Sequence, residues 1–274
     1  MLTDRKIGFI GVGNMGEALV KGLVASGRVE PSQVYVCDSS ARRARDVAGR
    51  YGVGLCATNA ELASLSDMVI VAVKPGDVDS ALAEAAPGLG EGKLVVSAAA
   101  GVTTAAISRR VGPDVPVVRA MPNTAALVME GAIGLYASEK VTGGQVGLVR
   151  ALFEAVGKVV VVETEQLLDA VTGLAGSGPA YILLFLEALV DAGVLVGLGR
   201  DKARTLVLQT ALGTARLAME GERDLAELRH MVTSPGGTTA SALFKLEEGG
   251  VRASVKRAVE AAVRRAGELS KTKP

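Results

Sequence analysis

Short apolar runs alternate with helical stretches through the first half of the chain. The runs are rich in valine and isoleucine and lie at residues 6–10, 34–38, 68–73, 93–97 and 116–121. Continuous apolar runs of this length are typical of parallel strands that are covered on both faces. Further strands are predicted at 133–137 and 158–162, on either side of a helix at 143–155. This pattern predicts an α/β fold with a doubly wound sheet.

The second part of the chain carries no strand signal. From about residue 163 the sequence is rich in alanine and leucine at helical spacing. We therefore predict a Rossmann-type dinucleotide-binding domain over residues 1–162 and an all-helical dimerisation domain over residues 163–274.

One predicted helix of the second domain, at about 179–198, is apolar on nearly every side. Residues 181–198 approach membrane-spanning length, but Glu187 and Asp191 lie at the centre, where charges in lipid are costly. A helical domain of about a hundred residues has too little surface to enclose such a helix alone. The pattern predicts that the chain lies outside membranes and self-associates, as a homodimer or a ring of dimers.

Composition narrows the partners and the chemistry. The 274 residues include 30 basic and 29 acidic side chains, so no basic face for nucleic acid is indicated and a small-molecule partner is expected. The two cysteines, Cys37 and Cys56, lack metal-ligand spacing, so no metal is expected and both are predicted to be buried thiols in a reducing compartment. His230 is the only histidine and no serine elbow accompanies it, which argues against a Ser-His-Asp hydrolase. The chain enters a strand almost at its start, which predicts a cytoplasmic protein without a signal peptide.

A glycine-rich turn follows the first predicted strand. The run Gly11-Val12-Gly13-Asn14-Met15-Gly16 stands between that strand and an amphipathic stretch, as in a dinucleotide-binding unit. Gly11 suits the tight turn, Gly13 allows a pyrophosphate to approach the backbone, and Gly16 lets the helix pack closely on the strand. The second strand ends in Asp38, 22 residues after Gly16. This context makes the prediction of a nucleotide site much more specific than the glycine motif alone would make it.

The choice between the two nicotinamide cofactors is ambiguous in the sequence. Asp38 would accept hydrogen bonds from a free ribose and repel a 2′-phosphate, which favours NAD. Ser39, Ser40, Arg42 and Arg43 follow directly and could bind that phosphate.

Residues 232–241 suggest an anion site in the second domain. The run Ser234-Pro235-Gly236-Gly237-Thr238-Thr239 precedes an apolar periodic segment, so its glycines and threonines stand at a predicted helix start. Unpaired N–H groups at such a start can hold a carboxylate. On this segment alone, a capped loop without a ligand is the alternative.

The residues after each predicted strand complete the picture, because a doubly wound sheet presents the carboxyl ends of its strands to the ligand. The fourth strand ends in Val73-Lys74-Pro75, the fifth runs into Ser97-Ala98-Ala99-Ala100-Gly101, and the sixth into Met121-Pro122-Asn123-Thr124. Gly176-Ser177-Gly178-Pro179-Ala180-Tyr181 opens the long apolar helix. With these six motifs in family order, essentially the whole chain resembles the Δ1-pyrroline-5-carboxylate reductases. One residue departs from the family pattern: Ala125 follows Met121-Pro122-Asn123-Thr124, where bacterial members commonly have proline.

The resemblance implies an activity and a set of roles. The family reduces the imine of 1-pyrroline-5-carboxylate to L-proline with hydride from NADPH or NADH, as the last step of proline synthesis. It implies that the Thr239 hydroxyl bonds the ring nitrogen, and that Ser234, Gly236, Gly237 and Thr238 hold the carboxylate. The resemblance tips the cofactor towards NADPH, with NADH possible. It also places the substrate pocket between one subunit's nucleotide domain and the partner's loop.

The resemblance suggests further cofactor contacts. Asn59 is expected near the adenosine ribose, with a helix N-cap as the alternative role. Asn123 is expected either to face the nicotinamide or substrate or to cap a turn. Contacts are also expected from Val73, Lys74, Pro75 and Ala99.

Two other functions compete. A β-hydroxyacid dehydrogenase would share the two-domain plan but needs a lysine on the first helix of the second domain, where residues 176–184 contain none. A non-catalytic nucleotide sensor would keep the glycine turn but has no need of the loop at 234–239. Turnover of pyrroline-5-carboxylate separates these possibilities.

Overall fold

The chain forms two compact units in a computed structural model that describes residues 2–271. One unit contains the residues up to 177 together with those from 261 onward, and the other contains residues 178–260. The first break lies after residue 177 rather than after the predicted 162 because the segment in between packs on the sheet: a β carbon on Gly134 would lie 2.8 Å from the side chain of Val171.

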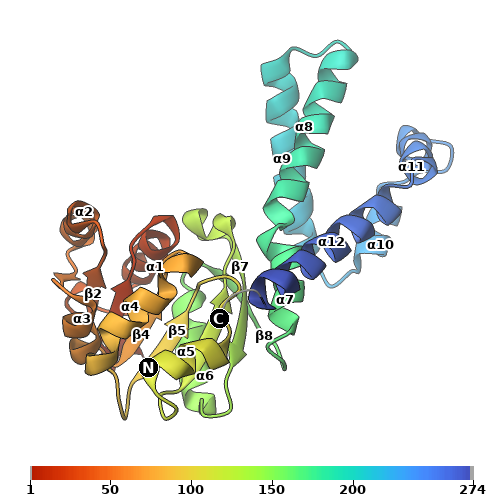
Figure 1. The fold of residues 1–274 in the computed structure, drawn as a ribbon. Helices are drawn as coiled ribbons and strands as arrows, with labels where there is room; N and C mark the ends of the chain where they lie inside the picture. The colour runs from red at the N-terminus through yellow and green to blue at the C-terminus, as the bar shows by residue number, and fades with distance from the viewer. Residues whose placement is uncertain (1, 272–274) are drawn as a thin grey trace. The chain divides into compact units, whose positions relative to one another are not determined.

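The first unit is built on an eight-stranded sheet (Figure 1). Its order is β3-β2-β1-β4-β5-β6-β7-β8. All neighbours pair in parallel except β6 and β7, which are antiparallel. The strands are β1 (Ile7–Ile10), β2 (Val34–Cys37), β3 (Gly54–Leu55), β4 (Met68–Val71), β5 (Leu94–Ser97), β6 (Val117–Met121), β7 (Gly131–Ala137) and β8 (Gly157–Val161).

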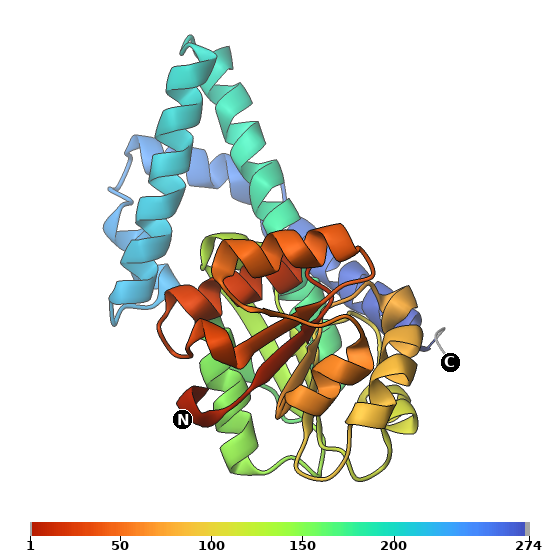
Figure 2. The same ribbon diagram turned by 90° about the vertical axis from the view of Figure 1, so that its left-hand side faces the viewer.

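Helices cover both faces of this sheet (Figure 2). Successive strand residues point to opposite faces, so Phe9 and Ile70 belong to one apolar core while Ile10 and Val71 belong to the other. The first core is completed by α1 (Asn14–Ala25), α2 (Ala41–Tyr51) and α6 (Gly143–Phe153). The second is completed by α3 (Asn59–Leu65), α4 (Val78–Ala85) and α5 (Thr104–Val111). The doubly wound sheet is confirmed.

Two features differ from the predicted sheet. Strand β3 was not predicted, because two residues that include a glycine make no apolar run. The reversed direction of β7 follows from the connection after β6, which is too short for a helical crossover. That connection contains a 3₁₀ turn, Thr124–Val128, in which the Ala125 carbonyl accepts from the Glu130 N–H at 3.1 Å, so the turn closes without the proline expected there.

The second unit is helical, as predicted. Its elements are α8 (Gly178–Leu195), α9 (Arg200–Glu220), α10 (Leu225–Met231), α11 (Thr238–Glu248) and the first half of α12 (Val251–Lys271). Helices α8 and α9 run side by side as a hairpin (Figures 1 and 2). A β carbon on Gly193 would lie only 2.9 Å from that of Ala203, so this glycine lets the two helices approach closely.

The hairpin exposes an unusual amount of apolar surface. Ile182, Leu183 and Leu184 are consecutive on α8 and each is at least 60% exposed. Within residues 2–271, the helical segment Leu167–Leu195 is the one stretch long and apolar enough to cross a membrane, and only 11% of its tested window is buried. A face this apolar requires a covering surface in the working protein.

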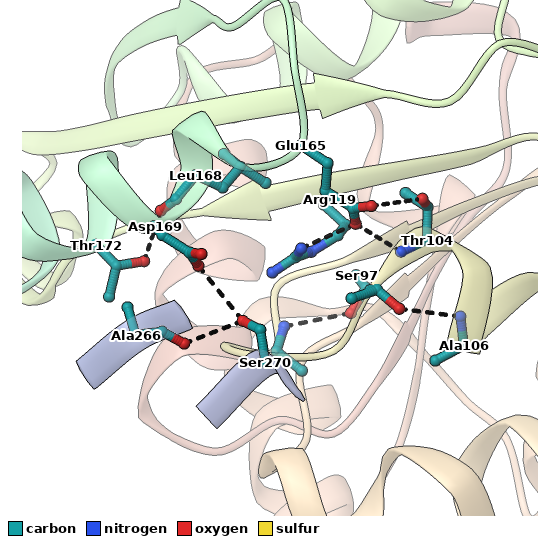
Figure 3. A network of polar contacts seen from close by, with 12 residues as sticks. Ser97, Thr104, Ala106, Arg119, Glu165, Leu168, Asp169, Thr172, Ala266 and Ser270 are labelled. Carbon is teal, nitrogen blue, oxygen red and sulfur yellow. Dashed lines mark hydrogen bonds and ion pairs between the residues drawn. The ribbon is translucent and has the colours of Figure 1, made fainter. Parts of the chain in front are cut away.

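Polar contacts hold the segment around Glu165 on the sheet and the last turns of α12 on α7, Leu167–Val171 (Figure 3). Arg119 of β6 is buried, and its guanidinium donates to Glu165 at 2.8 Å. The same carboxylate accepts from the backbone N–H and the hydroxyl of Thr104, at the start of α5. Nearby, the Ser270 hydroxyl near the end of α12 donates to Asp169 of α7 at 3.3 Å. The C-terminal turns of α12 are thereby part of the first unit.

The two cysteines should resist alkylation in the folded protein. Cys37 and Cys56 are both buried, and burial raises the pKa of Cys56 from 9.0 to about 11 and also raises the pKa of Cys37. The thiolate is the nucleophile, so iodoacetamide at pH 8 should modify neither thiol until the protein is unfolded, as read by mass spectrometry. The thiols of the unfolded chain ionise at a lower pH than the buried thiols do. The free energy of unfolding should therefore fall as the pH rises from about 9 to 11. Rapid labelling of the native protein would contradict this environment.

Candidate active site

The glycine-rich turn between β1 and α1 is shaped by close contacts. Gly11 has a φ of +88°, and a β carbon there would lie 2.6 Å from Cγ1 of Val73. A β carbon on Gly16 would lie 2.1 Å from the Gly11 carbonyl oxygen. These two positions therefore need glycine for conformation and for packing.

Gly13 differs because the space in front of it is open. The nearest atom to a β carbon there would be Nη1 of Arg43, at 3.9 Å. Gly13 is the N-cap of α1 without a side-chain cap, so the first-turn N–H groups of Asn14, Met15 and Gly16 have no intrahelical partner. Open space before a free helix start fits a pyrophosphate.

Asp38 supports this turn from the end of β2. One carboxylate oxygen accepts from the Val12 N–H at 2.8 Å, and the other accepts from the Ser40 N–H at 2.9 Å. Asp38 therefore links the glycine turn to the start of α2.

A cleft of about 420 Å³ opens at the carboxyl ends of β1, β2 and β4. It brings together five of the predicted cofactor residues: Gly11, Asp38, Ser39, Asn59 and Val73. The sequence reasoning missed its wall on the α4 side, formed by Asp77, Ser80, Ala81 and Glu84. Ser80 and Glu84 are one helical turn apart, a spacing that equally well describes a solvated helix face.

Asn59 is held from two sides within this cleft. Its backbone N–H donates to Oε1 of Glu84 at 3.0 Å, and its side-chain Nδ2 donates to Oε2 at 2.8 Å. The N-cap alternative is wrong, because Thr58 caps α3 by accepting from the Glu61 N–H and Asn59 is the first helical residue.

Several other predicted cofactor residues lie outside this cleft. Arg42 is 91% exposed and pairs with Asp46 at 3.9 Å. Lys74 is exposed, and Pro75 lines a separate hollow of about 150 Å³ with Gly101 and Thr103. Ala99 is buried two residues after the end of β5. None of these four therefore joins the walls of the 420 Å³ cleft.

Asn123 has a structural role in the turn after β6. Its Nδ2 donates to the Ala175 carbonyl at 3.0 Å, and its Oδ1 accepts from the Ala132 N–H at 3.1 Å. These bonds tie the start of β7 to the residues before α8. Asn123 precedes the 3₁₀ turn Thr124–Val128, but its side chain does not cap that turn, contrary to the turn-capping alternative.

The loop at 234–239 has the backbone of a helix start. Gly236 has a φ of +70°, and the Gly237 N–H donates to the Ser234 carbonyl at 3.0 Å. Gly237 is the N-cap of α11 and provides no side-chain cap. The first-turn N–H groups of Thr238 and Thr239 therefore have no intrahelical partner. The second unit thus carries an anion-binding geometry of its own.

Two family models match parts of the chain. One is described as "NADP oxidoreductase coenzyme F420-dependent" and matches residues 6–101. The other is described as "Pyrroline-5-carboxylate reductase dimerisation" and matches residues 165–269.

Comparisons with individual proteins cover nearly the whole chain. The pyrroline-5-carboxylate reductase of Pseudomonas aeruginosa is 41% identical over 98% of both chains. The solved pyrroline-5-carboxylate reductase of Coxiella burnetii is 42% identical, with a TM-score of 0.95 over 98% of this chain and 99% of that one. The structure of Plasmodium falciparum pyrroline carboxylate reductase with NADP bound is 31% identical, with a TM-score of 0.85 over 97% of this chain and 98% of that one. The chain therefore belongs to the pyrroline-5-carboxylate reductase family.

Proposed function

We propose that this protein reduces 1-pyrroline-5-carboxylate to L-proline with NADPH, with NADH as a second possible donor. The similarity along the whole chain carries this proposal, and the cleft beside the glycine turn supports it. The open space at Gly13 and the free start of α1 fit a dinucleotide. The bound cofactor would supply the hydride.

The residues of the chain would position the reactants rather than act as strong acids or bases. The carbon of an imine accepts hydride readily once its nitrogen is protonated, so alignment dominates the rate. Ser234, Gly236, Gly237 and Thr238 would hold the substrate carboxylate at the start of α11. The Thr239 hydroxyl would hydrogen-bond to the ring nitrogen, which keeps its proton as it becomes the amine of proline. Asn14, Met15 and the glycines of the turn would hold the pyrophosphate.

The decisive experiment is a steady-state assay with purified protein. The absorbance of NADPH should fall when pyrroline-5-carboxylate is added, and L-proline should appear in equal amount. Running NADH in parallel measures the preference between donors. Tight NADPH binding without turnover would contradict the reductase and favour a nucleotide sensor.

We further propose that the active enzyme is a homo-oligomer closed by a two-fold axis. The dimerisation family model spans α8 and α9, and their exposed apolar faces would be covered by a second copy rather than by lipid. Mixing Gly13→Ala and Thr239→Ala variants tests whether one pocket uses residues from two subunits. Verified hybrids should regain activity, whereas inactive hybrids would assign each pocket to a single chain. A cytoplasmic location and the absence of a nucleic-acid partner stay predictions.

The glycine turn yields a paired prediction. Gly16→Ala should lower the free energy of unfolding by roughly 1–3 kcal/mol, because its β carbon would overlap the Gly11 carbonyl. Gly13→Ala should leave the melting temperature near wild type, since the space there is open, yet weaken NADPH binding by crowding the pyrophosphate. Thermal melts and fluorescence titration measure the two effects. Wild-type NADPH affinity in Gly13→Ala would contradict the proposed pyrophosphate position.

A further inference from the structure

Glu84 of α4 occupies an unexpected place in the nucleotide cleft. Both oxygens of its carboxylate accept from Asn59, one from the backbone N–H and the other from the side-chain amide. It is also a lining residue of the 420 Å³ cleft itself. A side chain whose spacing in the sequence equally describes a solvated helix face therefore determines how the buried Asn59 side chain is presented.

The contacts of Asn59 restrict what its side chain offers a ligand. Its Nδ2 donates to Glu84 at 2.8 Å and lies 3.5 Å from the Ala81 carbonyl, so both amide hydrogens are directed at the protein. Within residues 2–271, no donor bonds the Oδ1 of Asn59. Asn59 is only 8% exposed, so the amide has little room to turn. The cleft therefore receives a hydrogen-bond acceptor from Asn59.

The charges that line the cleft likewise favour a ligand group that donates a hydrogen bond over one that carries negative charge. Its lining contains the carboxylates of Asp38, Asp77 and Glu84 but no lysine or arginine. The carboxylate of Glu84 also affects the end of β2: after burial, it is the next largest cause that raises the pKa of Cys37. Arg45 lines only the adjoining hollow of about 500 Å³, beyond Asp38 and Ala57.

We propose that Glu84 is a specificity-determining residue that reduces the preference of this enzyme for NADPH over NADH. It acts as a positioning residue by presenting the Asn59 carbonyl oxygen to the adenosine ribose, and its charge disfavours a 2′-phosphate there. A free 2′-hydroxyl can donate to Asn59, whereas a phosphate can only accept. The inference rests on the proposed function, since it takes this cleft as the adenosine site.

The test uses two nucleotides that lack the nicotinamide. Adenosine 2′,5′-bisphosphate and 5′-AMP differ only in the 2′-phosphate, so the ratio of their dissociation constants isolates this part of the cleft. Glu84→Gln removes the charge with little change in shape. By calorimetry, it should shift the ratio towards the bisphosphate by at least about threefold, the size expected for one partly screened charge nearby. The NADPH-to-NADH ratio of kcat/KM should shift in the same direction.

Two further variants keep the result interpretable. Glu84→Ala removes the charge and both bonds to Asn59, so the affinity for 5′-AMP should fall more than the affinity for the bisphosphate. Glu91→Gln is a charge-matched control, since Glu91 precedes the amino end of β5, whereas the cleft lies at the carboxyl ends of the strands. It should leave both ratios unchanged.

The outcomes separate the inference from the proposed function. An unchanged nucleotide ratio in both Glu84 variants, or an equal shift in Glu91→Gln, would overturn the role of Glu84 while leaving the reductase intact. Wild-type protein that binds neither nucleotide and no NADPH would instead overturn the cofactor site itself.

Discussion

Thr239→Val should lower kcat/KM for pyrroline-5-carboxylate roughly ten- to a hundredfold while the Kd for NADPH stays near wild type. Valine keeps the shape of the side chain and removes the hydroxyl proposed to bond the ring nitrogen. A hydrogen bond to a charged group is worth roughly 1.5–3 kcal/mol, which corresponds to that loss in rate. Thr239 is the second residue of α11, so the change leaves the loop and its N-cap in place. Steady-state kinetics and NADPH titration together measure the effect.

Thr239→Ser is the matched control, because serine retains the hydroxyl. It should recover most of the activity that valine loses. If valine leaves kcat/KM unchanged, Thr239 has no part in the reaction. If both variants lose NADPH affinity, the residue serves the nucleotide rather than the imine.

Leu184→Glu should dissociate the oligomer and lower activity by about a hundredfold or more. Leu184 is 69% exposed in the single chain, so a charge there costs the isolated fold little. Buried between subunits, the same unpaired carboxylate would cost several kcal/mol. Light scattering after size-exclusion chromatography measures the mass, and circular dichroism verifies that the helices persist.

Leu184→Met provides the comparison, because methionine conserves apolar volume and should keep both mass and activity. A fully active monomer of Leu184→Glu would contradict the proposed assembly. An intact oligomer carrying the glutamate would place Leu184 outside the interface.

The sequence predicts the sheet well where strands are buried on both faces. Such strands, for example Met68–Val71, are apolar without interruption and stand out from their surroundings. Gly54–Leu55 has no such signal, because it is a strand only by pairing with β2. The direction of β7 depends on the length of the preceding connection rather than on the apolar pattern of the strand.

The candidate site is predictable where a residue type has a local steric reason. Gly11 and Gly16 are required by contacts within one turn, so the motif identifies them. The partnership of Glu84 with Asn59 has no local signal, because the two residues are 25 positions apart and meet only through the packing of α3 on α4. Neighbouring side chains on α2 point about 100° apart, so choosing between Arg42 and Arg43 as a cofactor contact requires the orientation of that helix.

The path of α12 has a consequence for how the protein can be divided. Because its last turns belong to the first unit, where Ala266 is buried and Ser270 bonds Asp169, the helical unit is an insertion in the middle of the first unit's chain. No single cleavage releases either unit with all of its own residues. A gene truncated after the sheet would yield a nucleotide-binding fragment that lacks part of its packing. A chain with residues 178–260 replaced by a short linker keeps both pieces, and it is the better starting point for isolating that fold.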